Sequence, residues 1–366
     1  MKALNILKYY YPSTGGTETY VKQLCGGMHK YGIEPSILTF NHIPRIKTAW
    51  GKVDDIAVRR VACHLKLFSQ PVGLLAAEMK QLIPKADLVH LHLPFPNAEF
   101  LYKYISKPLV VTWCVDPVNT RWEKIFPVFR PSLIQVLEKA RKIVLIGPNL
   151  LEHSPTLQPY EKKCKVIPLA CSPVKGHEPV PTVRRVNKER PAILFVGKLR
   201  KYKGVEYLIR SVQHLPDVQL RIVGDGEELS NLRQLTKKTG IDSRVIFLKT
   251  VTDEQLSFEY KNANLFVLPS IDASEAFGIV QLEAMSYGLP VINTALPSSV
   301  PFVSLDGVTG ITVPHSDPPA LSAAIKRLFG DHSFYENCSR NAIERAKLFS
   351  EENMIKKHSE VYRECV

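Results

Sequence analysis

The chain has 366 residues, of which 45% are hydrophobic and 23% are charged, and this composition excludes disordered and fibrous proteins. A single core rarely grows beyond about 250–300 residues, so two domains are predicted. The 48 Lys and Arg exceed the 35 Asp and Glu and give a formal net charge of +13, which favours anionic partners such as nucleotide phosphates, acidic lipid headgroups or nucleic acid.

Signals for targeting are sparse. The sequence contains no run of 18 apolar residues, and its first residues lack an apolar segment followed by a small-residue cleavage site. We therefore expect a cytoplasmic protein, at most peripheral on the inner face of a membrane. Seven cysteines without a CxxC pair are typical of a reducing compartment. Zinc-finger spacing, RNP-like aromatic patterns and long basic runs are missing, so we do not expect nucleic acid as a partner.

Short apolar runs alternate with helical patterns in the first half of the chain. Strands are predicted at Ala3–Lys8, Pro35–Phe40, Ile56–Ala62, Asp87–Leu93, Leu109–Trp113, Lys142–Ile146 and Cys164–Leu169. Helices are predicted between them, among others at Thr17–Tyr31, Val72–Leu82 and Pro131–Ala140. This alternation is typical of βαβ units that build a parallel sheet.

A proline-rich stretch, Cys171–Pro191, interrupts this rhythm and is predicted to be a linker. The rhythm then restarts, with strands predicted at Ala192–Val196, Gln219–Val223, Arg244–Leu248, Leu265–Leu268 and Pro290–Asn293. Helices near Pro319–Phe329, Phe334–Leu348 and Glu351–Glu364 end the chain. The predicted fold is α/β, with two Rossmann-like doubly wound domains facing a cleft. Ligands of such sheets bind outside the carboxyl ends of the strands.

Paired glycines, Gly15 and Gly16, follow the first strand and precede an amphipathic helix. Glycines at this point let the backbone approach a ligand closely and direct N–H groups at an anion near a helix N-terminus. A tight turn that needs a positive φ explains them equally well, so both interpretations stay open.

A basic loop follows the first strand of the second half. It places Lys198, Arg200, Lys201 and Lys203 within six residues. In a strand-to-helix loop facing a cleft, such a cluster suits a diphosphate. On charge alone, a solvated basic loop is the simpler interpretation.

Two glutamates, Glu275 and Glu283, lie eight positions apart, with Gly278 between them. If a helix begins near Phe277, its free N–H groups can hold a phosphate. Eight helical residues rise about 12 Å, similar to the reach from a sugar to a ribose across a diphosphate. Glu283 would then accept from ribose hydroxyls, while Glu275 would hold the transferred sugar. The simpler alternative is one glutamate in an exposed loop and the other on a helix flank.

Two histidines, His90 and His92, alternate with apolar residues, so both imidazoles point to one face of a predicted strand. Packing within the core is the default interpretation for both histidines, and it is stronger for His90 than for His92. His92 lies nearer the carboxyl end of the strand and is a candidate for the acceptor side of the cleft. A metal would need a third ligand, and none is evident. Asp-x-Asp is also missing, so neither a metal ion nor another cofactor is expected.

Large apolar residues recur at steps of four, three and four residues in one segment, namely at Trp122, Phe126, Phe129 and Leu133. Core packing is the default interpretation. The alternative is an interfacial patch that touches lipid headgroups or a lipid-linked acceptor, with Trp122 on the acceptor side. Two prolines, at 127 and 131, argue against one continuous helix.

These motifs together resemble the retaining glycosyltransferases of the GT-B fold, the fourth family of sugar transferases. The resemblance covers nearly the whole chain and is densest over residues 190–320. It rests on Gly15-Gly16, Gly197-Lys198-Leu199 with Lys203-Gly204, Val223-Gly224-Asp225-Gly226-Glu227, the pair Glu275 and Glu283, and Gly307-x-x-Gly310-x-x-Val313-Pro314. It implies an acceptor-side domain at 1–172, a linker at 173–190, a nucleotide-sugar domain at 191–348 and a final helix at 349–366 that returns to the first domain.

The resemblance also implies roles for individual residues. Lys203 and Lys198 would bind the donor diphosphate, helped by the backbone of Phe277, Gly278 and Ile279. Glu283 would bind the ribose, and Glu275 would lie beside the donor sugar. No carboxylate is placed as a covalent nucleophile, so we expect same-face attack in which the leaving phosphate takes the acceptor's proton.

The sequence departs from the family pattern at two positions. Relatives usually carry Arg where this chain has Lys198, which keeps the charge but loses the bidentate geometry. Relatives also commonly place a His near the donor sugar after the strand that ends at Trp113, whereas this chain has Cys114. A thiol cannot make the hydrogen bonds of an imidazole, so the orientation of the sugar, or activity itself, is in question.

The run from Asp272 to Met285 is similar to bacterial mannosyl- and rhamnosyltransferases of surface polysaccharide synthesis, such as that of lipopolysaccharide. The predicted donor is therefore GDP-mannose or GDP-rhamnose, with UDP-sugars second, and the acceptor an oligosaccharide or a lipid-linked glycan. Two other functions remain open. A GT-B nucleotide-sugar epimerase would release a free sugar, and a catalytically silent subunit would bind without turnover.

Overall fold

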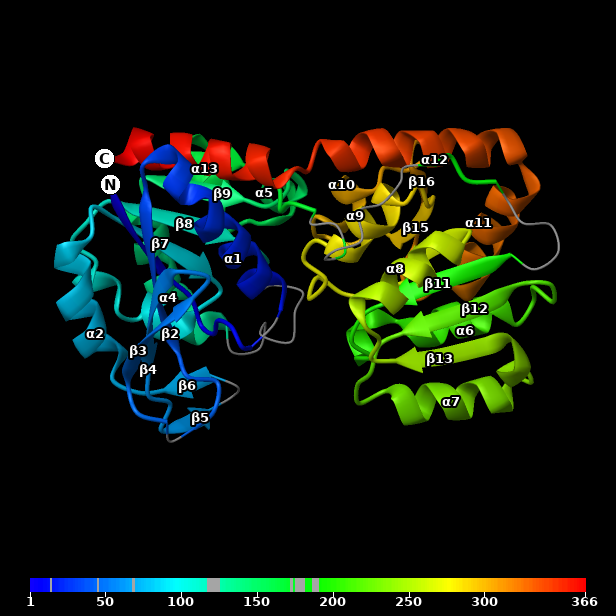
Figure 1. The fold of residues 1–366 in the computed structure, drawn as a ribbon, viewed down its shortest axis with the longest axis horizontal. Helices are drawn as coiled ribbons and strands as arrows, with labels where there is room; N and C mark the ends of the chain where they lie inside the picture. The colour runs from blue at the N-terminus through cyan, green and yellow to red at the C-terminus, as the bar shows by residue number, and fades with distance from the viewer. Residues whose placement is uncertain are drawn as a thin grey trace. The chain divides into compact units, whose positions relative to one another are not determined.

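The computed structural model describes residues 1–13, 15–44, 46–67, 70–116, 126–171, 174, 182–185 and 191–366. The chain divides into two compact units (Figure 1). Unit 1 comprises Met1–Ala170 together with Glu351–Val366, and unit 2 comprises Cys171–Ser350. Each unit has its own sheet of mainly parallel strands, which confirms the predicted α/β class with two doubly wound domains. Most of the predicted linker lies outside the described residues.

The sheet of unit 1 has the strand order β10-β9-β8-β7-β1-β2-β4-β3. Its strands are β1 Lys2–Ile6, β2 Glu34–Phe40, β3 Ala49–Val53, β4 Ile56–Val61, β7 Leu88–Leu93, β8 Leu109–Trp113, β9 Lys142–Leu145 and β10 Cys164–Val166. All neighbours pair in parallel except β3, which runs antiparallel to β4 at the edge. The central strands β7 and β8 are buried along their whole length, as expected for a parallel sheet covered by helices.

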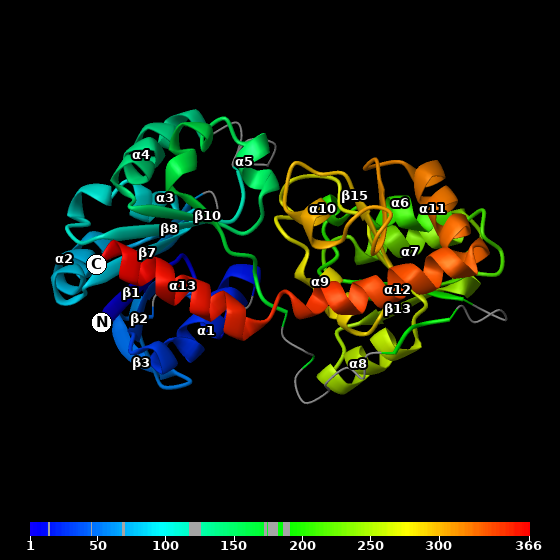
Figure 2. The same ribbon diagram turned by 90° about the horizontal axis from the view of Figure 1, so that it is seen from above.

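The helices of unit 1 are α1 Gly16–Met28, α2 Leu75–Leu82, α3 Pro96–Glu99, α4 Phe126–Lys139, α5 Asn149–His153 and α13 Glu351–Cys365. The last of these, α13, packs along α1 (Figure 2). Gly27 permits this contact, because a Cβ there would lie 2.3 Å from Cδ1 of Ile355.

Unit 1 also contains elements that the sequence did not predict. The edge strand β3 has no apolar run, and its five residues are either exposed or half-buried. A two-stranded hairpin, β5 Leu65–Leu67 and β6 Gln70–Val72, precedes α2. The predicted helix at Val72–Leu82 therefore starts late, at Leu75. Gly73 separates the two elements, where a Cβ would lie 2.1 Å from the carbonyl oxygen of Ala62.

The prediction that two prolines prevent a continuous helix is wrong. Helix α4 runs unbroken over Phe126–Lys139, with Pro131 inside it. Pro127 falls in the first turn, where its missing N–H costs nothing, and Pro131 removes only one intrahelical hydrogen bond. Burial of Phe126, Phe129 and Leu133 offsets that loss and confirms core packing for these three. Trp122 lies outside the described residues.

The sheet of unit 2 has the order β13-β12-β11-β14-β15-β16, and all its neighbours are parallel. Its strands are β11 Ala192–Val196, β12 Gln219–Val223, β13 Val245–Lys249, β14 Leu265–Leu268, β15 Val291–Thr294 and β16 Gly310–Val313. Its helices are α6 Val205–Val212, α7 Leu229–Lys238, α8 Asp253–Asn262, α9 Ile279–Ser286, α10 Val300–Val303, α11 Pro318–Gly330 and α12 His332–Lys347. Three strands agree with their predicted bounds residue for residue, whereas β16 was not predicted. No helix in the described part of the chain is long and apolar enough to cross a bilayer.

Candidate active site

Closely packed glycines form the carboxyl edge of the sheet in unit 2. Gly197 and Gly224 follow β11 and β12 with φ angles of 156° and 142°, a region that favours glycine. A Cβ on Gly224 would lie 1.9 Å from the carbonyl oxygen of Gly197, and one on Gly226 would lie 2.4 Å from that of Leu199. The two loops therefore meet backbone to backbone. A Cβ on Gly197 would also lie 3.6 Å from Nζ of Lys203, so this ammonium sits directly against the glycine turn.

A buried ion pair joins two of the predicted site residues. Nζ of Lys203, at the end of the 3₁₀ turn Lys201–Lys203, donates to Oε2 of Glu275. The same carboxylate oxygen accepts from Oγ of Ser270, at 2.9 Å. Lys203 and Glu275 are only 8% and 7% exposed, so the pair is held in a low-dielectric setting where its attraction is strong.

The charge of Lys203 is stabilised by this pairing. Burial by itself lowers the pKa of the ammonium, but the charge of Glu275 and the hydrogen bond to it outweigh burial and raise the pKa above its ordinary value. Lys203 is therefore a fixed cation at the carboxyl edge of the sheet. The exposed-loop interpretation of Glu275 is wrong, because the carboxylate is buried and doubly hydrogen-bonded.

Ser270 belongs to this cluster, although the sequence did not point to it. It follows β14, and its carbonyl oxygen accepts from Oγ1 of Thr294 at 2.5 Å. Both residues are buried. A lone serine after a strand carries no spacing signal, so only the fold reveals the contact.

Lys198 does not join the buried pair. Its side chain is exposed, and the structure shows it no hydrogen bond or ion pair to a described residue. Its ammonium is therefore a solvated charge close to the glycine turn, in contrast to Lys203.

Helix α9 begins at Ile279, after Gly278, rather than near Phe277. Gly278 has a φ of 69°, and a Cβ on it would lie 2.5 Å from Cδ2 of Leu268. Glu275 therefore precedes the helix, and the estimate of 12 Å from eight helical residues does not apply. No side chain caps the first turn of α9, which leaves its N–H groups available to an anion.

Glu283 lies in α9 and is half-buried. Its carboxylate accepts from the hydroxyl of Tyr260 in α8, at 2.7 Å. Burial raises the pKa of Glu283 to about 7, although the hydrogen bond from Tyr260 works against this shift. Tyr260 itself stacks on Tyr287 with ring centroids 5.2 Å apart. The carboxylate is therefore held in a fixed direction by a packed aromatic partner that the sequence did not reveal.

In unit 1, the paired glycines Gly15 and Gly16 lie together with Cys114 at the start of α1. Gly15 precedes α1 with a φ of −173°, and neither Gly15 nor Gly16 has a positive φ, so the positive-φ interpretation is wrong. A Cβ on Gly15 would lie 2.5 Å from Oε2 of Glu18, whereas one on Gly16 would meet nothing within 4 Å. Cys114 follows β8, is buried, and makes a hydrogen bond with the side chain of Thr17. Burial raises the pKa of its thiol to about 12, so it is protonated at neutral pH.

His90 and His92 belong to a buried network in unit 1. His90 bonds the hydroxyls of Tyr362 and Thr112, at 2.6 and 2.7 Å, which confirms it as a packing histidine. Nε2 of His92 lies 3.1 Å from Oδ1 of Asn5, while its Nδ1 has no partner among the described residues. Burial lowers the pKa of His92 to about 3, so it is neutral at physiological pH.

The C-terminal helix adds a third histidine to this network. Nε2 of His358 in α13 lies 2.7 Å from the hydroxyl of Tyr20 in α1, and burial lowers its pKa to about 4. This histidine could not be identified from sequence patterns, because its partner is 338 positions away. Among the described residues, no three His, Cys, Asp or Glu side chains are arranged to hold a metal ion.

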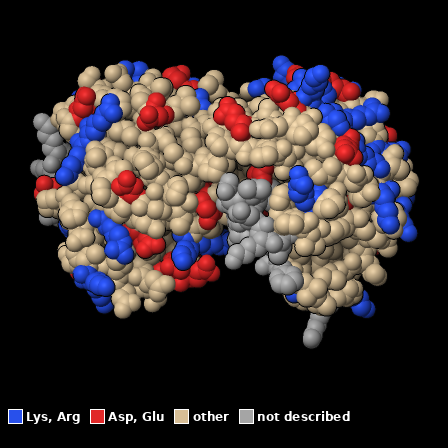
Figure 3. Space-filling view, turned by 180° about the vertical axis from the view of Figure 1, so that it is seen from behind, with Lys and Arg blue, Asp and Glu red and all other residues tan. Residues whose placement is uncertain are grey.

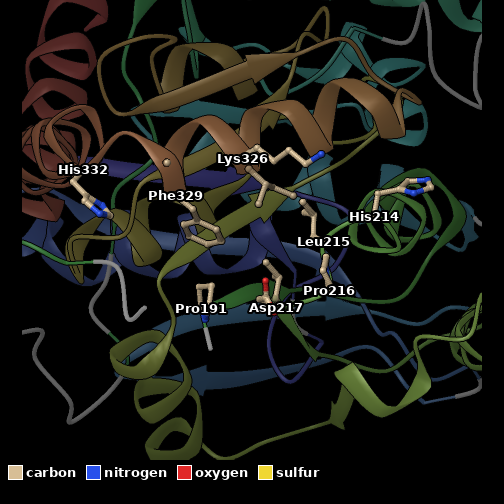
Figure 4. Close-up of a pocket in the computed structure, with 11 residues that line it drawn as sticks. Pro191, His214, Leu215, Pro216, Asp217, Lys326, Phe329 and His332 are labelled. Atoms are coloured by element: carbon tan, nitrogen blue, oxygen red, sulfur yellow. The ribbon is translucent and has the colours of Figure 1, made fainter. Parts of the chain in front are cut away.

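A hollow of about 520 Å³ lies on the opposite edge of the sheet in unit 2 (Figure 4). It is lined by Pro191, His214, Leu215, Pro216, Asp217, Val218, Ile325, Lys326, Phe329, Gly330 and His332. Pro191 and Val218 directly precede β11 and β12, so the hollow lies at the amino ends of these strands. It is therefore separate from the Lys203–Glu275 pair, which lies at the carboxyl ends, where such sheets bind ligands.

Comparison with known proteins gives consistent matches in both units. Residues 14–172 match the family model described as Glycosyltransferase Family 4, and residues 180–345 match that described as Glycosyl transferases group 1. The chain is 31% identical to the D-rhamnosyltransferase WbpZ of Pseudomonas aeruginosa, over 93% of this chain and 90% of that protein. It is 30% identical to O-antigen chain mannosyltransferase C of Escherichia coli, over 99% of this chain and 98% of that protein.

A solved structure also shares the fold. HepE of Anabaena, in complex with UDP and glucose, superposes with a TM-score of 0.76 at 17% identity, over 100% of both chains. At this identity the likeness concerns the fold alone.

Proposed function

The chain belongs to the group 1 glycosyltransferases of the GT-B fold, and on this basis we propose a retaining, metal-independent transfer of a hexose from a nucleoside diphosphate to a hydroxyl of a glycan or lipid-linked acceptor. The observation that carries the proposal is the buried Lys203–Glu275 pair at the carboxyl edge of the sheet in unit 2. It combines a fixed cation for a leaving diphosphate with a carboxylate for the sugar.

The reaction breaks the bond between the anomeric carbon and the diphosphate, and it forms a bond from the acceptor oxygen to the same face. Negative charge grows on the leaving phosphate, and Lys203, Lys198 and the free amides of α9 offset it. The leaving phosphate takes the proton of the acceptor hydroxyl. Because Oε2 of Glu275 already accepts from Lys203 and Ser270, this carboxylate is suited to position the sugar rather than to attack it.

We propose that the bound donor lies along α9. Phosphates would meet the backbone at Phe277, Gly278 and Ile279, and the ribose would meet Glu283. Gly15, Gly16 and Cys114 of unit 1 are proposed to contribute to donor binding, and His92 to the acceptor side. The burial of His92, at 2% exposure, means that it would act on an acceptor only through a neighbouring residue.

We propose mannose or rhamnose carried by GDP as the donor, in the synthesis of a surface polysaccharide. The names of the mannosyl- and rhamnosyltransferase relatives support the sugars. UDP-sugars are the second choice. Titration of GDP, UDP and ADP against the protein tests the base directly, because only the cognate nucleotide should bind tightly.

Transfer is expected to proceed in EDTA at the rate seen without it, because the phosphate charge is met by lysines and amides. The measurement is release of nucleoside diphosphate with acceptor present, in EDTA and after adding Mg²⁺ or Mn²⁺. Activity abolished by EDTA and restored by a divalent ion would contradict metal independence. Donor hydrolysis without acceptor, yielding a free sugar, would instead favour the epimerase.

Cys114→His is expected to raise kcat or leave it near that of the parent, because relatives place His at this position near the donor sugar. Bound donor should also slow modification of Cys114 by a thiol reagent, measured at alkaline pH because its pKa is about 12. Mass mapping of the modified peptide separates Cys114 from the other six cysteines. If donor does not slow the labelling, Cys114 has only a structural role. If donor binds but no turnover is detected, the catalytically silent subunit is favoured.

A further inference from the structure

Arg184, within the predicted linker, is bonded to the ends of two helices of unit 2. Its Nε donates to the carbonyl oxygen of Tyr287 at 2.9 Å. Its two terminal nitrogens donate to the carbonyl oxygens of Tyr260, at 3.1 Å, and of Lys261. Tyr260 and Lys261 lie in the last turn of α8, and Tyr287 directly follows α9. The guanidinium therefore joins the carboxyl ends of α8 and α9.

The chemistry of these contacts favours arginine over lysine. The last carbonyl groups of a helix have no partner within it, and the helix dipole makes them attract a cation. A planar guanidinium can donate to several carbonyls at once, whereas an ammonium is a point charge. On the face drawn in Figure 3, Lys and Arg side chains stand in solvent with Asp and Glu among them. Arg184 is instead half-buried, and its partners are main-chain carbonyls.

The main chain around Arg184 is also held against unit 2. Its amide donates to Oγ of Ser339 at 2.8 Å, and this hydroxyl donates to the carbonyl oxygen of Gly288 at 2.7 Å. Gly288 follows α9 with a φ of 73°, and a Cβ on it would lie 2.6 Å from the carbonyl oxygen of Thr182. The segment therefore packs backbone to backbone on the turn after α9, and the guanidinium extends from a fixed point.

The two helices that Arg184 joins are the ones that carry Glu283 and its partner. Tyr260 of α8 donates its hydroxyl to the carboxylate of Glu283 in α9, at 2.7 Å. The ring of Tyr260 stacks on that of Tyr287, with 16° between the ring planes. Arg184 bonds the main chain of both stacked tyrosines. The direction of the Glu283 carboxylate therefore depends on the placement of α8 against α9, which the guanidinium fixes.

We propose that Arg184 is a positioning residue for the ribose of the donor, because it holds α8 and α9 where Tyr260 orients Glu283. This role rests on the proposed function, in which Glu283 binds the ribose hydroxyls. Arg184 itself acts through the two tyrosines and does not contact the donor. Loss of Arg184 should therefore weaken the binding of nucleotides that carry ribose hydroxyls and spare nucleotides that lack them.

The test compares the Kd values of GDP and UDP with those of their 2′,3′-dideoxy forms, measured by calorimetry on the full chain. The parent is expected to bind the ribose form of its cognate nucleotide about tenfold more tightly than the dideoxy form. Arg184→Met should weaken the ribose form about fivefold and the dideoxy form less than about twofold, so the preference falls to about twofold or threefold. Arg184→Lys keeps the charge but not the planar donors, and should fall between the two.

Arg244 supplies a matched control for a loss of stability. Its Nη1 also donates to three carbonyl oxygens, those of Val212, Leu215 and Val218, before the amino end of β12. Arg244→Met should therefore lower the midpoint of thermal unfolding, as Arg184→Met does, but leave the preference for the ribose form unchanged.

Arg185 supplies a control for charge. Its side chain is 89% exposed and lies 3.7 Å from a carboxylate oxygen of Glu336. Arg185→Met removes the same group from the next position of the chain, and both the unfolding midpoint and the preference should stay like those of the parent.

Two outcomes would overturn the positioning role. One is an Arg184→Met variant that keeps the full preference of the parent. The other is an Arg244→Met variant that loses as much of it, because the effect would then come from stability alone. If Arg184→Met does not fold, Arg184→Lys decides in the same way, and an unaltered preference in that variant overturns the role.

Glu283→Ala, measured on the same nucleotides, separates this role from the proposed function. If Glu283→Ala loses the preference and the Arg184 variants keep it, Glu283 binds the ribose without help from Arg184. If the parent shows no preference, or Glu283→Ala retains it, the ribose-binding role of Glu283 is wrong, and the role of Arg184 is wrong with it.

Discussion

Glu275→Ala is expected to lower kcat about 30- to 1000-fold, while the bare nucleoside diphosphate binds nearly as well as before. The sugar flattens and gains positive charge as its bond to phosphate breaks, so a carboxylate beside it helps most in the transition state. Loss of one such contact costs about 2–4 kcal/mol in activation free energy. Glu275→Gln should fall between the parent and Glu275→Ala, since it keeps the shape but loses the charge.

The structure adds a second consequence to this substitution. Removal of Glu275 leaves the buried ammonium of Lys203 without its counterion, and breaking a buried pair commonly costs about 3–5 kcal/mol of stability. Thermal unfolding of each variant therefore accompanies the kinetics. Ser270→Ala, which removes only the 2.9 Å hydrogen bond to Oε2, supplies a folded variant with a smaller fall in kcat. A kcat that survives Glu275→Ala would refute the assignment.

Glu283→Ala is expected to impair the binding of the donor rather than the chemical step. The ribose barely changes during the reaction, so its contacts are alike in the ground and transition states. Loss of such uniform binding raises KM and the Kd of the bare nucleotide, with less effect on kcat. Tyr260→Phe removes the 2.7 Å hydrogen bond that orients Glu283 but keeps the aromatic packing, and should shift the same two constants by less. Unaltered nucleotide affinity in Glu283→Ala would show that this carboxylate does not bind the donor.

Much of the fold could be predicted because buried parallel strands are short apolar runs bounded by polar segments. That rule located β8, β11, β12 and β14 at their observed bounds. It failed for β3 and β5, whose side chains are exposed or half-buried, and for β6, which has only three residues. For helix α4 the error was the opposite one. Its two prolines predicted a break, but burial of one face stabilises a continuous helix.

For the candidate site, sequence reasoning selected residue types but not their partners. Lys203 and Glu275 stood out as a basic loop and a spaced carboxylate, yet their contact spans 72 positions and arises only when β11 and β14 lie side by side. Ser270, Tyr260 and His358 were missed because a single serine, tyrosine or histidine has no periodic signature. The start of α9 was misplaced because Gly278, with its left-handed backbone, ends the turn before the helix begins.

Unit 1 is expected to lose stability steeply between pH 7 and pH 5, because of its buried histidines. His90, His92 and His358 are all buried, and their rings lie close together, with the His90 and His92 centroids 4.1 Å apart. Burial lowers all three pKa values, to about 3 for His92 and about 4 for His358, and the neighbouring imidazoles lower that of His90 further. The ordinary value in an unfolded chain is about 6.5.

The sign of the effect follows from proton binding. Below pH 6.5 the unfolded chain takes up protons that the folded network refuses, so stability is complete above that pH and falls as the pH drops toward the folded pKa values. One differential proton is worth about 1.4 kcal/mol per pH unit, so the three histidines together approach about 4 kcal/mol per unit near pH 5.

Urea unfolding at pH 7, 6 and 5, followed by tryptophan fluorescence, measures this loss in unit 1 specifically. All three tryptophans, Trp50, Trp113 and Trp122, lie within Met1–Ala170. His92→Gln removes one titrating ring and keeps an amide for Asn5, so it should reduce the slope by about 1.4 kcal/mol per pH unit. His153→Gln, at an exposed position of the same unit, should leave the slope unchanged. If the unfolding free energy changes with pH by the same slope in the parent and in His92→Gln, protonation of the buried network does not govern the acid stability of unit 1.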